Sequence, residues 1–489
     1  MKNIILFLLL LNFHGAIQAQ SEHKVMIEND SLKQKGRLDK NGSKTGKWIY
    51  YHPNGNVKYI GRYKKDDLTG KWKGFYENGA TQIVSNYKKG KRDGWSKEFY
   101  ENGQLSASGK YKNDLETGSW KGYYENGKLS KVGNLINGKP TGEWKFYFPN
   151  GQLEKSETYI DGKKSGAWKV YYENGQLQSM GQFKMTAKTG EWKFFTEDGA
   201  LQGFRNYRED KDDGLYIYYN TNGSPAVTGN YAKGGKIGEW KWYSEDGKIR
   251  GVKNFADNKE QGLLIEYYDN GQVRCVGEMN DSLKTGEWKW YYENKKLMNV
   301  ANYQNGETSG EWKYYYENGN LQAIGTMLRG DKIGEWKYYH ENGQLKNKGT
   351  SEENKSIGKW QWYYENGQLQ AEGNYNNQGL QINHWTWYYM NGQIEIKGQY
   401  ANGDKSSRWY WYDKKGKLLQ TGAYRQGKKT GKWSIYNSET GKLKIMDNYQ
   451  TKKRTYYNEK GKPTKIINTI ALEEEYKTVP TPSEENVKK

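Results

Sequence analysis

The sequence predicts an all-β protein, an elongated single-sheet stack of about seventeen β-hairpin units that is twisted or curved. Three observations predict it: Trp recurs on a 24-residue grid, the third residue after each grid position is aromatic, and Asn-Gly follows in most units. A single hairpin is marginally stable in water. We therefore expect neighbouring hairpins to pair edge to edge and to share a layered core.

Composition supports a core made of rings. The 489-residue chain has 60 Gly, 44 Tyr and 20 Trp, with 15% aromatic but only 34% hydrophobic residues and a net charge of +20. A low apolar content and a high charge are typical of disordered chains, but those chains are poor in aromatic residues. The apolar material must therefore be concentrated in rings at regular positions.

The N-terminus has the pattern of a secretory signal peptide. Met1 to Asn3 is short and basic, Ile4 to Leu11 is an apolar run too short to span a bilayer, and Ala19 suits the residue before cleavage. We expect residues 1–19 to be the signal peptide and residues 20–34 to be an N-terminal leader. The mature protein is then exported: periplasmic, cell-surface or extracellular.

The Trp grid defines the repeat. Its Trp residues are Trp48, Trp72, Trp120, Trp144, Trp168, Trp192, Trp240, Trp288, Trp312, Trp336 and Trp360. Tyr216 and Leu264 fill two further positions, and Ser96 fills another, with Trp95 one residue off the grid. One extra residue then shifts the grid, which continues at Trp385, Trp409 and Trp433. We expect Trp312 to be a core or ladder ring and Trp95 to face the other way unless a bulge corrects it.

A typical unit begins at Thr141 and reaches Leu153. Its first strand holds the Trp, and Asn150-Gly151 then predicts a tight hairpin turn, because both residues accept positive φ. A second strand follows, and a looser Gly- and Lys-rich turn, residues 162–166, leads to the next Trp.

The second aromatic column lies three residues after the grid. Its members include Tyr51, Phe75, Phe99, Tyr123, Tyr171, Phe195, Tyr219, Tyr267, Tyr315, Tyr363, Tyr412 and Tyr436. An offset of three places this column and the Trp column on opposite faces of the sheet. Curvature should enclose one column, and the sequence does not say which.

The unit Gly-x-Trp-x-x-Tyr-Tyr-x-Asn-Gly-x-Leu, followed by Gly-x-Tyr and a Gly-Lys turn, resembles the MORN-variant repeat found in proteins labelled YwqK-type antitoxins. The resemblance covers residues 35–462, the expected repeat array. It implies stacked β-hairpins with a scaffold or binding role, and it brings no catalytic residues. Residues 463–489 leave the repeat and are predicted to be a largely disordered tail.

No catalytic or metal-binding pattern is present in the sequence. The five His are scattered, and His52 and His340 occupy equivalent positions where Tyr is usual, so each is interpreted as a ring substitute. Cys275 stands alone in a strand pattern and is interpreted as a small semi-buried hydrophobe. The Glu before many grid Trp residues is interpreted as a member of cross-strand charge pairs. We expect no enzymatic activity, no metal and no cofactor.

Lys directly after the grid position is the main functional hint. It should share a face with the aromatic column, giving a ladder of cations and rings. The candidate binding face comprises Lys145, Tyr147, Lys169, Tyr171, Lys289, Tyr291, Lys313, Tyr315, Lys337 and Tyr339. The same lysines could instead only solvate the sheet and block edge aggregation.

Two functions follow as expectations. The first is an exported, non-enzymatic scaffold that binds envelope polysaccharide, an anionic glycan or a protein partner. A membrane surface stays open as a partner, and nucleic acid is not expected. The alternative is an antitoxin or immunity-type protein that neutralises a toxin by protein–protein binding.

Overall fold

A computed structural model describes residues 24–29 and 32–468 of the chain, and every regular element in these ranges is a β-strand. The prediction of an all-β array of antiparallel hairpins is confirmed. The expected signal peptide, residues 1–19, lies outside the described residues, as does the tail from residue 469 onward. The chain divides into two units, Met1–Gly247 and Lys248–Lys489.

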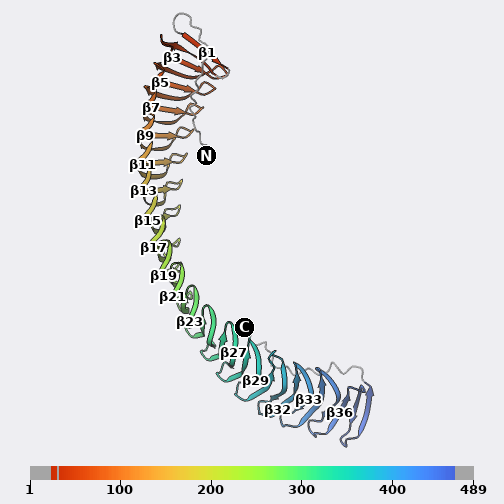
Figure 1. Ribbon diagram of the computed structural model, residues 1–489. Coiled ribbons are helices and arrows are strands. Elements are labelled where there is room, and N and C mark those ends of the chain that lie inside the picture. The colour runs from red at the N-terminus through yellow and green to blue at the C-terminus, as the bar shows by residue number, and fades with distance from the viewer. Residues whose placement is uncertain (1–23, 30–31, 469–489) are drawn as a thin grey trace. The chain divides into compact units, whose positions relative to one another are not determined.

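In the first unit each strand pairs antiparallel with its neighbours in sequence (Figure 1). Its strands are β1 (Lys24–Asn29), β2 (Leu32–Leu38), β3 (Lys44–Tyr51), β4 (Val57–Lys64), β5 (Asp67–Phe75), β6 (Thr81–Lys88), β7 (Lys91–Phe99), β8 (Leu105–Lys112), β9 (Leu115–Tyr123), β10 (Leu129–Ile136), β11 (Lys139–Tyr147), β12 (Leu153–Ile160), β13 (Lys163–Tyr171), β14 (Leu177–Lys184), β15 (Ala187–Phe195), β16 (Leu201–Arg208), β17 (Lys211–Tyr219), β18 (Pro225–Ala232) and β19 (Gly235–Tyr243).

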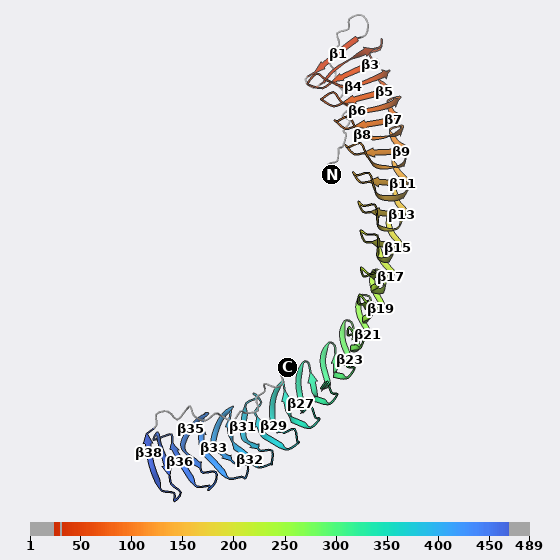
Figure 2. The ribbon, with the colours of Figure 1, turned by 180° about the vertical axis from the view of Figure 1, so that it is seen from behind.

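The second unit repeats the same meander (Figure 2). Its strands are β20 (Ile249–Ala256), β21 (Lys259–Tyr267), β22 (Val273–Asn280), β23 (Leu283–Tyr291), β24 (Leu297–Gln304), β25 (Glu307–Tyr315), β26 (Leu321–Leu328), β27 (Asp331–Tyr339), β28 (Leu345–Glu352), β29 (Lys355–Tyr363), β30 (Leu369–Tyr375), β31 (Gln381–Tyr388), β32 (Ile394–Ala401), β33 (Asp404–Tyr412), β34 (Leu418–Arg425), β35 (Lys428–Tyr436), β36 (Leu443–Asn448), β37 (Lys453–Tyr457) and β38 (Pro463–Asn468).

The two kinds of turn differ from the prediction. At the Asn-Gly turn, the N–H of Phe148 donates to the carbonyl of Gln152 at 2.8 Å, and of the three residues between them only Gly151 (φ 95°) has positive φ. This turn is therefore a three-residue loop with a bulge. The other turn, predicted to be looser, is the tighter one. Ile136 pairs with Lys139 around two residues that both have positive φ, Asn137 (51°) and Gly138 (78°).

A bulge places most Trp rings of the column over a glycine. Between β10 and β11, Asn134 pairs with Thr141 and Val132 with Lys145. Residues 142–144, the last of which is Trp144, therefore form a bulge opposite Gly133 alone. A Cβ on Gly133 would lie 2.1 Å from the indole, and the indole N–H donates to the carbonyl of Asn134 at 3.0 Å. The ring therefore occupies the space that the missing side chain leaves.

This Trp-on-Gly pair recurs through both units. Its members are Gly36–Trp48, Gly109–Trp120, Gly133–Trp144, Gly181–Trp192, Gly229–Trp240, Gly277–Trp288, Gly325–Trp336, Gly349–Trp360, Gly373–Trp385, Gly398–Trp409 and Gly422–Trp433. All of these Trp side chains are buried. The enclosed column is therefore the Trp column, and we call its side of the sheet the inner face. The outer face carries the half-buried aromatic column.

Trp312 is a ladder ring but is only half-buried. It contacts Tyr303 and Tyr314, with ring centroids at 6.3 and 5.5 Å. Trp312 faces Ala301, whereas the fully buried indoles of the other repeats face a glycine. The methyl group takes the space that the ring would need, and the Trp312 indole N–H has no hydrogen-bond partner.

Lysine side chains on the inner face lie between the Trp column and solvent. The Lys284 ammonium lies 4.4 Å from the Trp288 ring centroid and 4.9 Å from that of Trp290. Equivalent lysines, four residues before the grid Trp, lie over Trp48, Trp192, Trp240, Trp336, Trp409 and Trp433. These cation–π contacts let a single-layer sheet bury a hydrophobic column under charged groups.

Tyr side chains next to the Asn-Gly turns join successive repeats. The Tyr124 hydroxyl donates to the carbonyl of Tyr147 at 2.6 Å, and the same bond recurs along both units. His52 and His340 make the equivalent contact, to the carbonyls of Phe75 and Tyr363 at 3.0 and 2.9 Å. Both histidines therefore take the place of a Tyr ring, as the sequence indicated.

The paired strands extend beyond residues 35–462 at both ends, from Lys24 to Asn468. Near the C-terminal end an ion pair replaces the Trp-on-Gly pair. Arg454 makes two bonds to the buried Asp447, at 2.6 and 2.8 Å. A polar pair at this point ends the aromatic column, as terminal repeats of stacked arrays require.

Extra residues are absorbed in turns. The residue that shifts the grid lies between Gly373 and Trp385, where Asn376 and Leu380 bracket a three-residue loop of the kind found at the Asn-Gly turns. The N–H of Asn376 donates to the carbonyl of Leu380 at 2.9 Å. Trp385 remains over Gly373 and is buried, so the insertion does not disturb the column.

Candidate binding groove around Trp95

The candidate residues from the sequence lie on the outer face. Lys145, Tyr147, Lys169, Tyr171, Lys289, Tyr291, Lys313, Tyr315, Lys337 and Tyr339 are all half-buried and follow grid Trp residues by one or three positions. Residues one and three positions after the Trp point away from the inner face. The lysine and aromatic columns therefore share a face in both units.

Most of these lysines are neutralised. Lys145 pairs with Glu143 at 3.4 Å and Lys289 with Glu287 at 2.8 Å, and the pairs Lys337–Glu335 and Lys313–Glu311 are equivalent. The prediction that these Glu residues form cross-strand pairs is wrong: the residues directly opposite Glu143 and Glu287 are Thr158 and Asn302, which carry no charge. Each Glu instead pairs with the Lys two residues along its own strand, on the same face. Lys169 is the exception, since it follows Ala167-Trp168 and has no ion-pair partner among the described residues.

One repeat turns its indole outward. Ser96 holds the grid position, pairs with Gly109 and is buried, and its hydroxyl lies 2.5 Å from that of Ser85. Trp95 is displaced to the outer face, where its side chain is 51% exposed. On the inner face the Arg92 guanidinium covers the Tyr111 ring at 3.9 Å. The period-two expectation for Trp95 is confirmed, because the bulge opposite Asn86 does not return the indole to the inner face.

Small side chains beside Trp95 leave a groove. Lys97 on β7, Ser108 on β8 and Lys121 on β9 form one cross-strand row. Ser108 stands where the neighbouring repeats have valine, and Ser119, before Trp120, stands where several later repeats have glutamate. The resulting cavity of about 550 Å³ is lined by Trp95, Lys97, Leu105, Ser108, Ser119, Lys121 and Tyr123.

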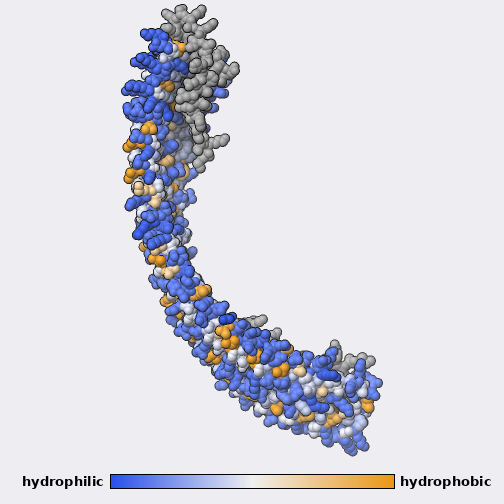
Figure 3. All heavy atoms as spheres, in the orientation of Figure 1, coloured by the Kyte–Doolittle hydropathy of each residue, from blue (hydrophilic) through white to orange (hydrophobic). Residues whose placement is uncertain are grey.

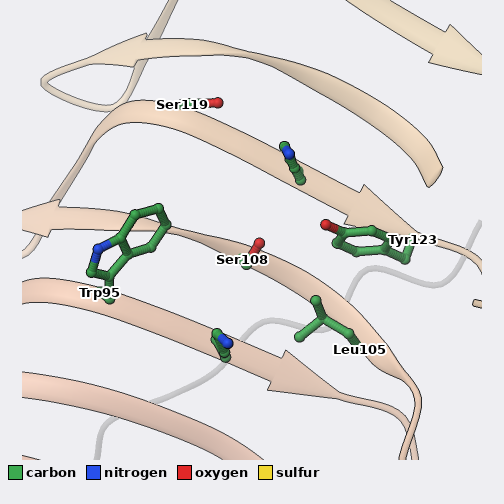
Figure 4. Close-up of a pocket in the computed structure, with 7 residues that line it drawn as sticks. Trp95, Leu105, Ser108, Ser119 and Tyr123 are labelled. Atoms are coloured by element: carbon green, nitrogen blue, oxygen red, sulfur yellow. The ribbon is translucent and has the colours of Figure 1, made fainter.

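Aromatic residues lie at the two ends of the groove. Figure 4 shows Trp95 on one strand and Tyr123 on the strand two places away, with Ser108 on the strand between them. Figure 3 shows that most of the visible surface is hydrophilic, with hydrophobic residues in small separate groups. Among the described residues, Trp95 is the only Trp in the set of exposed large hydrophobic side chains.

The groove is electropositive. No carboxylate lines it, and neither Lys97 nor Lys121 has an ion-pair partner in the described part of the chain. The Lys110 ammonium lies 5.0 Å from the Trp95 ring centroid and adds a third cation. Two free ammonium groups, two serine hydroxyls and two aromatic rings can hold an anionic, hydroxyl-rich ligand by charge, hydrogen bonding and stacking.

Sequence reasoning noted Trp95 but did not assign it to a binding site. The signal was present: Lys97 and Lys121 have no Glu two residues before them, unlike the paired lysines of later repeats. Within residues 24–29 and 32–468, no cluster of His, Cys, Asp and Glu could hold a metal ion. The Cys275 thiol is buried, and burial raises its pKa to about 11, so it is a poor nucleophile.

The described residues include no helix that is long and apolar enough to cross a membrane.

A family model described as MORN repeat variant matches more than half of the chain. The matched segments are residues 44–65, 68–89, 92–113, 116–137, 140–161, 164–185, 236–257, 284–305, 309–328, 332–352, 357–377 and 383–402. They include the repeat of Trp95 but not the positions of Tyr216 and Leu264. No curated protein matches the sequence.

Likenesses to solved structures are weak. The TcdB2-TccC3 crystal structure is 12% identical with a TM-score of 0.14, covering 89% of this chain and 29% of that one. The Photorhabdus luminescens Tc holotoxin pore is 11% identical with a TM-score of 0.13, covering 90% and 27%. A porin-like protein from Bacteroides uniformis is 10% identical with a TM-score of 0.10, covering 59% and 90%. The chain spans less than a third of the toxin-complex chains, and these scores carry no functional argument.

Proposed function

The chain belongs to the MORN repeat variant family, and on this premise we propose that it is an exported, non-enzymatic scaffold that binds an acidic polysaccharide in the groove around Trp95. The paired strands β7, β8 and β9 of the repeat array position the residues of the site. The groove supplies the recognition: Trp95 and Tyr123 stack on sugar rings, and Lys97 and Lys121 bind the acidic groups.

The observation that carries the proposal is the combination of an outward indole with two unpaired lysines. Exposing a Trp side chain to water is unfavourable unless a ligand covers the ring. The unpaired ammonium groups in the row next to it attract anions, whereas the Glu-paired lysines of later repeats have little residual charge. We therefore place the site in the first unit and not along the whole lysine ladder.

The composition of the groove supports a binding role over catalysis. Its lining contains no carboxylate, histidine or cysteine, so it offers none of the usual pairs for general acid–base or nucleophilic chemistry. Ser108 and Ser119 have no base beside them in this lining. A polymer that lies across three strands would contact both lysines at once.

The experiment compares two matched double variants in binding of polygalacturonate, a carboxylated polysaccharide, by titration calorimetry. Lys97→Gln/Lys121→Gln removes the unpaired ammonium groups. We expect about tenfold weaker binding, because each lost charge contact contributes up to about 1 kcal/mol. Lys289→Gln/Lys313→Gln removes the same net charge from Glu-paired positions and should change binding less than about twofold. Binding should weaken as salt rises.

Equal weakening in the two double variants would mean that the whole ladder binds and that the groove has no special role. No binding of polygalacturonate or of another acidic polysaccharide would refute the proposal. A protein captured in place of a polysaccharide would favour the immunity-type function instead.

A further inference from the structure

The repeat at Tyr216 departs from the Trp-on-Gly pattern at three positions of the inner face. Tyr216 replaces the Trp, Arg205 replaces the glycine that the ring should cover, and Asp212 replaces the covering lysine. The Arg205 guanidinium lies 5.1 Å from the Tyr216 ring centroid. These changes exchange a filled hydrophobic pair for a charged group over a ring.

A hollow lies beside this arginine. Phe194 on β15, Gly203 on β16 and Tyr218 on β17 form one cross-strand row. Gly203 has no side chain, so no side chain of this row separates Phe194 from Tyr218. The cavity, about 260 Å³, is lined by side chains that include Phe194, Tyr218, Tyr207, Arg205, Lys188 and Gln202.

The combination is specific to this place. In the other described repeats except that of Gly251, the middle residue of this row carries a side chain, as Ala323 does between Tyr314 and Tyr338. The row with Gly251 in the middle has Trp242 on one side but Glu266 on the other. Only the row of Gly203 leaves an open slot between two aromatic rings.

The charge of the hollow is positive. Arg205 has no carboxylate within ion-pair distance in the described chain, and Lys188, whose ammonium lies 5.0 Å from the Tyr207 ring centroid, has none either. Asp212, which pairs in register with Tyr207, is the carboxylate packed beside this site. Two cations against one acid leave a net attraction for an anion.

We propose that this hollow is a second binding site, separate from the groove around Trp95, and that it takes a planar aromatic carboxylate. β15 and β17 are two strand spacings apart, about 10 Å, which accommodates one ring in stacking contact with both walls. The ring lies between Phe194 and Tyr218, over Gly203. Its carboxylate binds the Arg205 guanidinium, a geometry that allows two parallel hydrogen bonds.

The test uses para-fluorobenzoate as the probe, with binding to the full chain followed by fluorine NMR line broadening. Arg205→Gln should weaken binding at least about tenfold, because it removes the charge-assisted contact. Arg208→Gln is the matched control: it removes the same charge from the same strand, at an exposed side chain that pairs with Asp213 outside the hollow. It should leave binding within about twofold of the original protein.

A second variant guards against loss of structure at Arg205. Tyr218→Val removes one wall and keeps both cations, and valine already occupies the equivalent position at Val170. It should weaken binding by about tenfold while the far-UV spectrum stays unchanged. The neutral analogue para-fluorobenzamide should not compete.

Three results would overturn the proposal: no binding of para-fluorobenzoate to the original protein, binding by Arg205→Gln within twofold of it, or equal competition by the amide. Lys97→Gln/Lys121→Gln should bind the probe as the original protein does. This distinguishes the hollow from the groove around Trp95, so either site can fail alone.

Discussion

The repeat of Trp336 and the repeat of Trp95 have the same backbone pairing but opposite surfaces. Trp336 pairs with Gly349 between β27 and β28, and Ser96 pairs with Gly109 between β7 and β8, at equivalent positions of the unit. Trp336 is fully buried, whereas Trp95 is 51% exposed. A displacement of the indole by one residue leaves the hairpin in register and moves the ring to the other face.

The comparison shows that turns and glycines fix the register, and that the Trp only determines what the inner face contains. In the Trp95 repeat, Ser85, Ser96 and Arg92 fill the inner face in place of an indole. The indole is then available on the outer face. A binding residue can thus arise inside a repeat without a change of fold.

The largest effect is expected for Trp336→Ala. Removing a fully buried indole leaves a cavity beside Ala323 and Met327, and the local free energy of unfolding should fall by about 3–5 kcal/mol. Hydrogen exchange of the amides of β27 and β28 measures this loss, because stacked repeats open in segments. Unchanged protection at these amides would contradict the assignment of the Trp column to the core.

A smaller loss is expected for Gly325→Ala. The new methyl would lie 2.2 Å from the Trp336 ring, so the ring must move outward, as Trp312 has done over Ala301. Overpacking of this kind costs about 1–3 kcal/mol. Exchange at β27 and reactivity of Trp336 toward an indole-modifying reagent should both rise. A ring that stays protected would show that the glycine is not needed for space.

Glu98→Gln should act in the opposite direction in the Trp95 repeat. Burial, with a smaller contribution from Glu116, raises the pKa of the Glu98 carboxyl, although Arg92 opposes this. A raised folded-state pKa means that stability is complete below the unfolded value, about 4.3, and is lost as pH rises through the folded value. The variant should therefore stabilise β7 and β8 by up to about 1 kcal/mol near pH 7.

Near pH 4 that gain should vanish, because Glu98 is then largely protonated in both states. Hydrogen exchange of β7 and β8 at the two pH values makes the comparison. A gain that does not depend on pH would assign the effect to packing and not to charge.

The smallest effect on stability is expected for Trp95→Ala. The ring lies on the surface, so the loss should be about 0.5 kcal/mol or less. The same variant should weaken polygalacturonate binding by several-fold, because a stacking wall of the groove is lost. A loss as large as that of Trp336→Ala would place Trp95 in the core and remove the contrast between the two repeats.

Much of the fold was predictable because its signals are periodic. Strand positions, the two faces and the reversal of Trp95 follow from a 24-residue grid and a period of two. The tight two-residue turn was predicted at the Asn-Gly edge of the sheet but lies at the opposite edge, because Asn-Gly suits both two-residue and three-residue loops. The pairing of Trp144 with Gly133 was not predicted, since it depends on a bulge that hydrophobic periodicity does not reveal.

The candidate site was less predictable than the fold. Placing Lys145 and Tyr147 on one face required only alternation, but the neutralising contact to Glu143 depends on side-chain geometry. The groove depends on what is missing: a small residue at Ser108 and no acid before Lys97. Such departures become visible only when each repeat is compared with the average unit.

The loop at Asn376–Leu380 has a consequence for how a gene encoding such an array can change. An added codon there alters the turn type and leaves Trp385 over Gly373. The first unit has the same arrangement, where a three-residue loop between Asp39 and Ser43 separates Gly36 from Trp48. A one-residue insertion at this edge therefore leaves the Trp-on-Gly pair intact, whereas an insertion inside a strand would turn the following side chains to the opposite face.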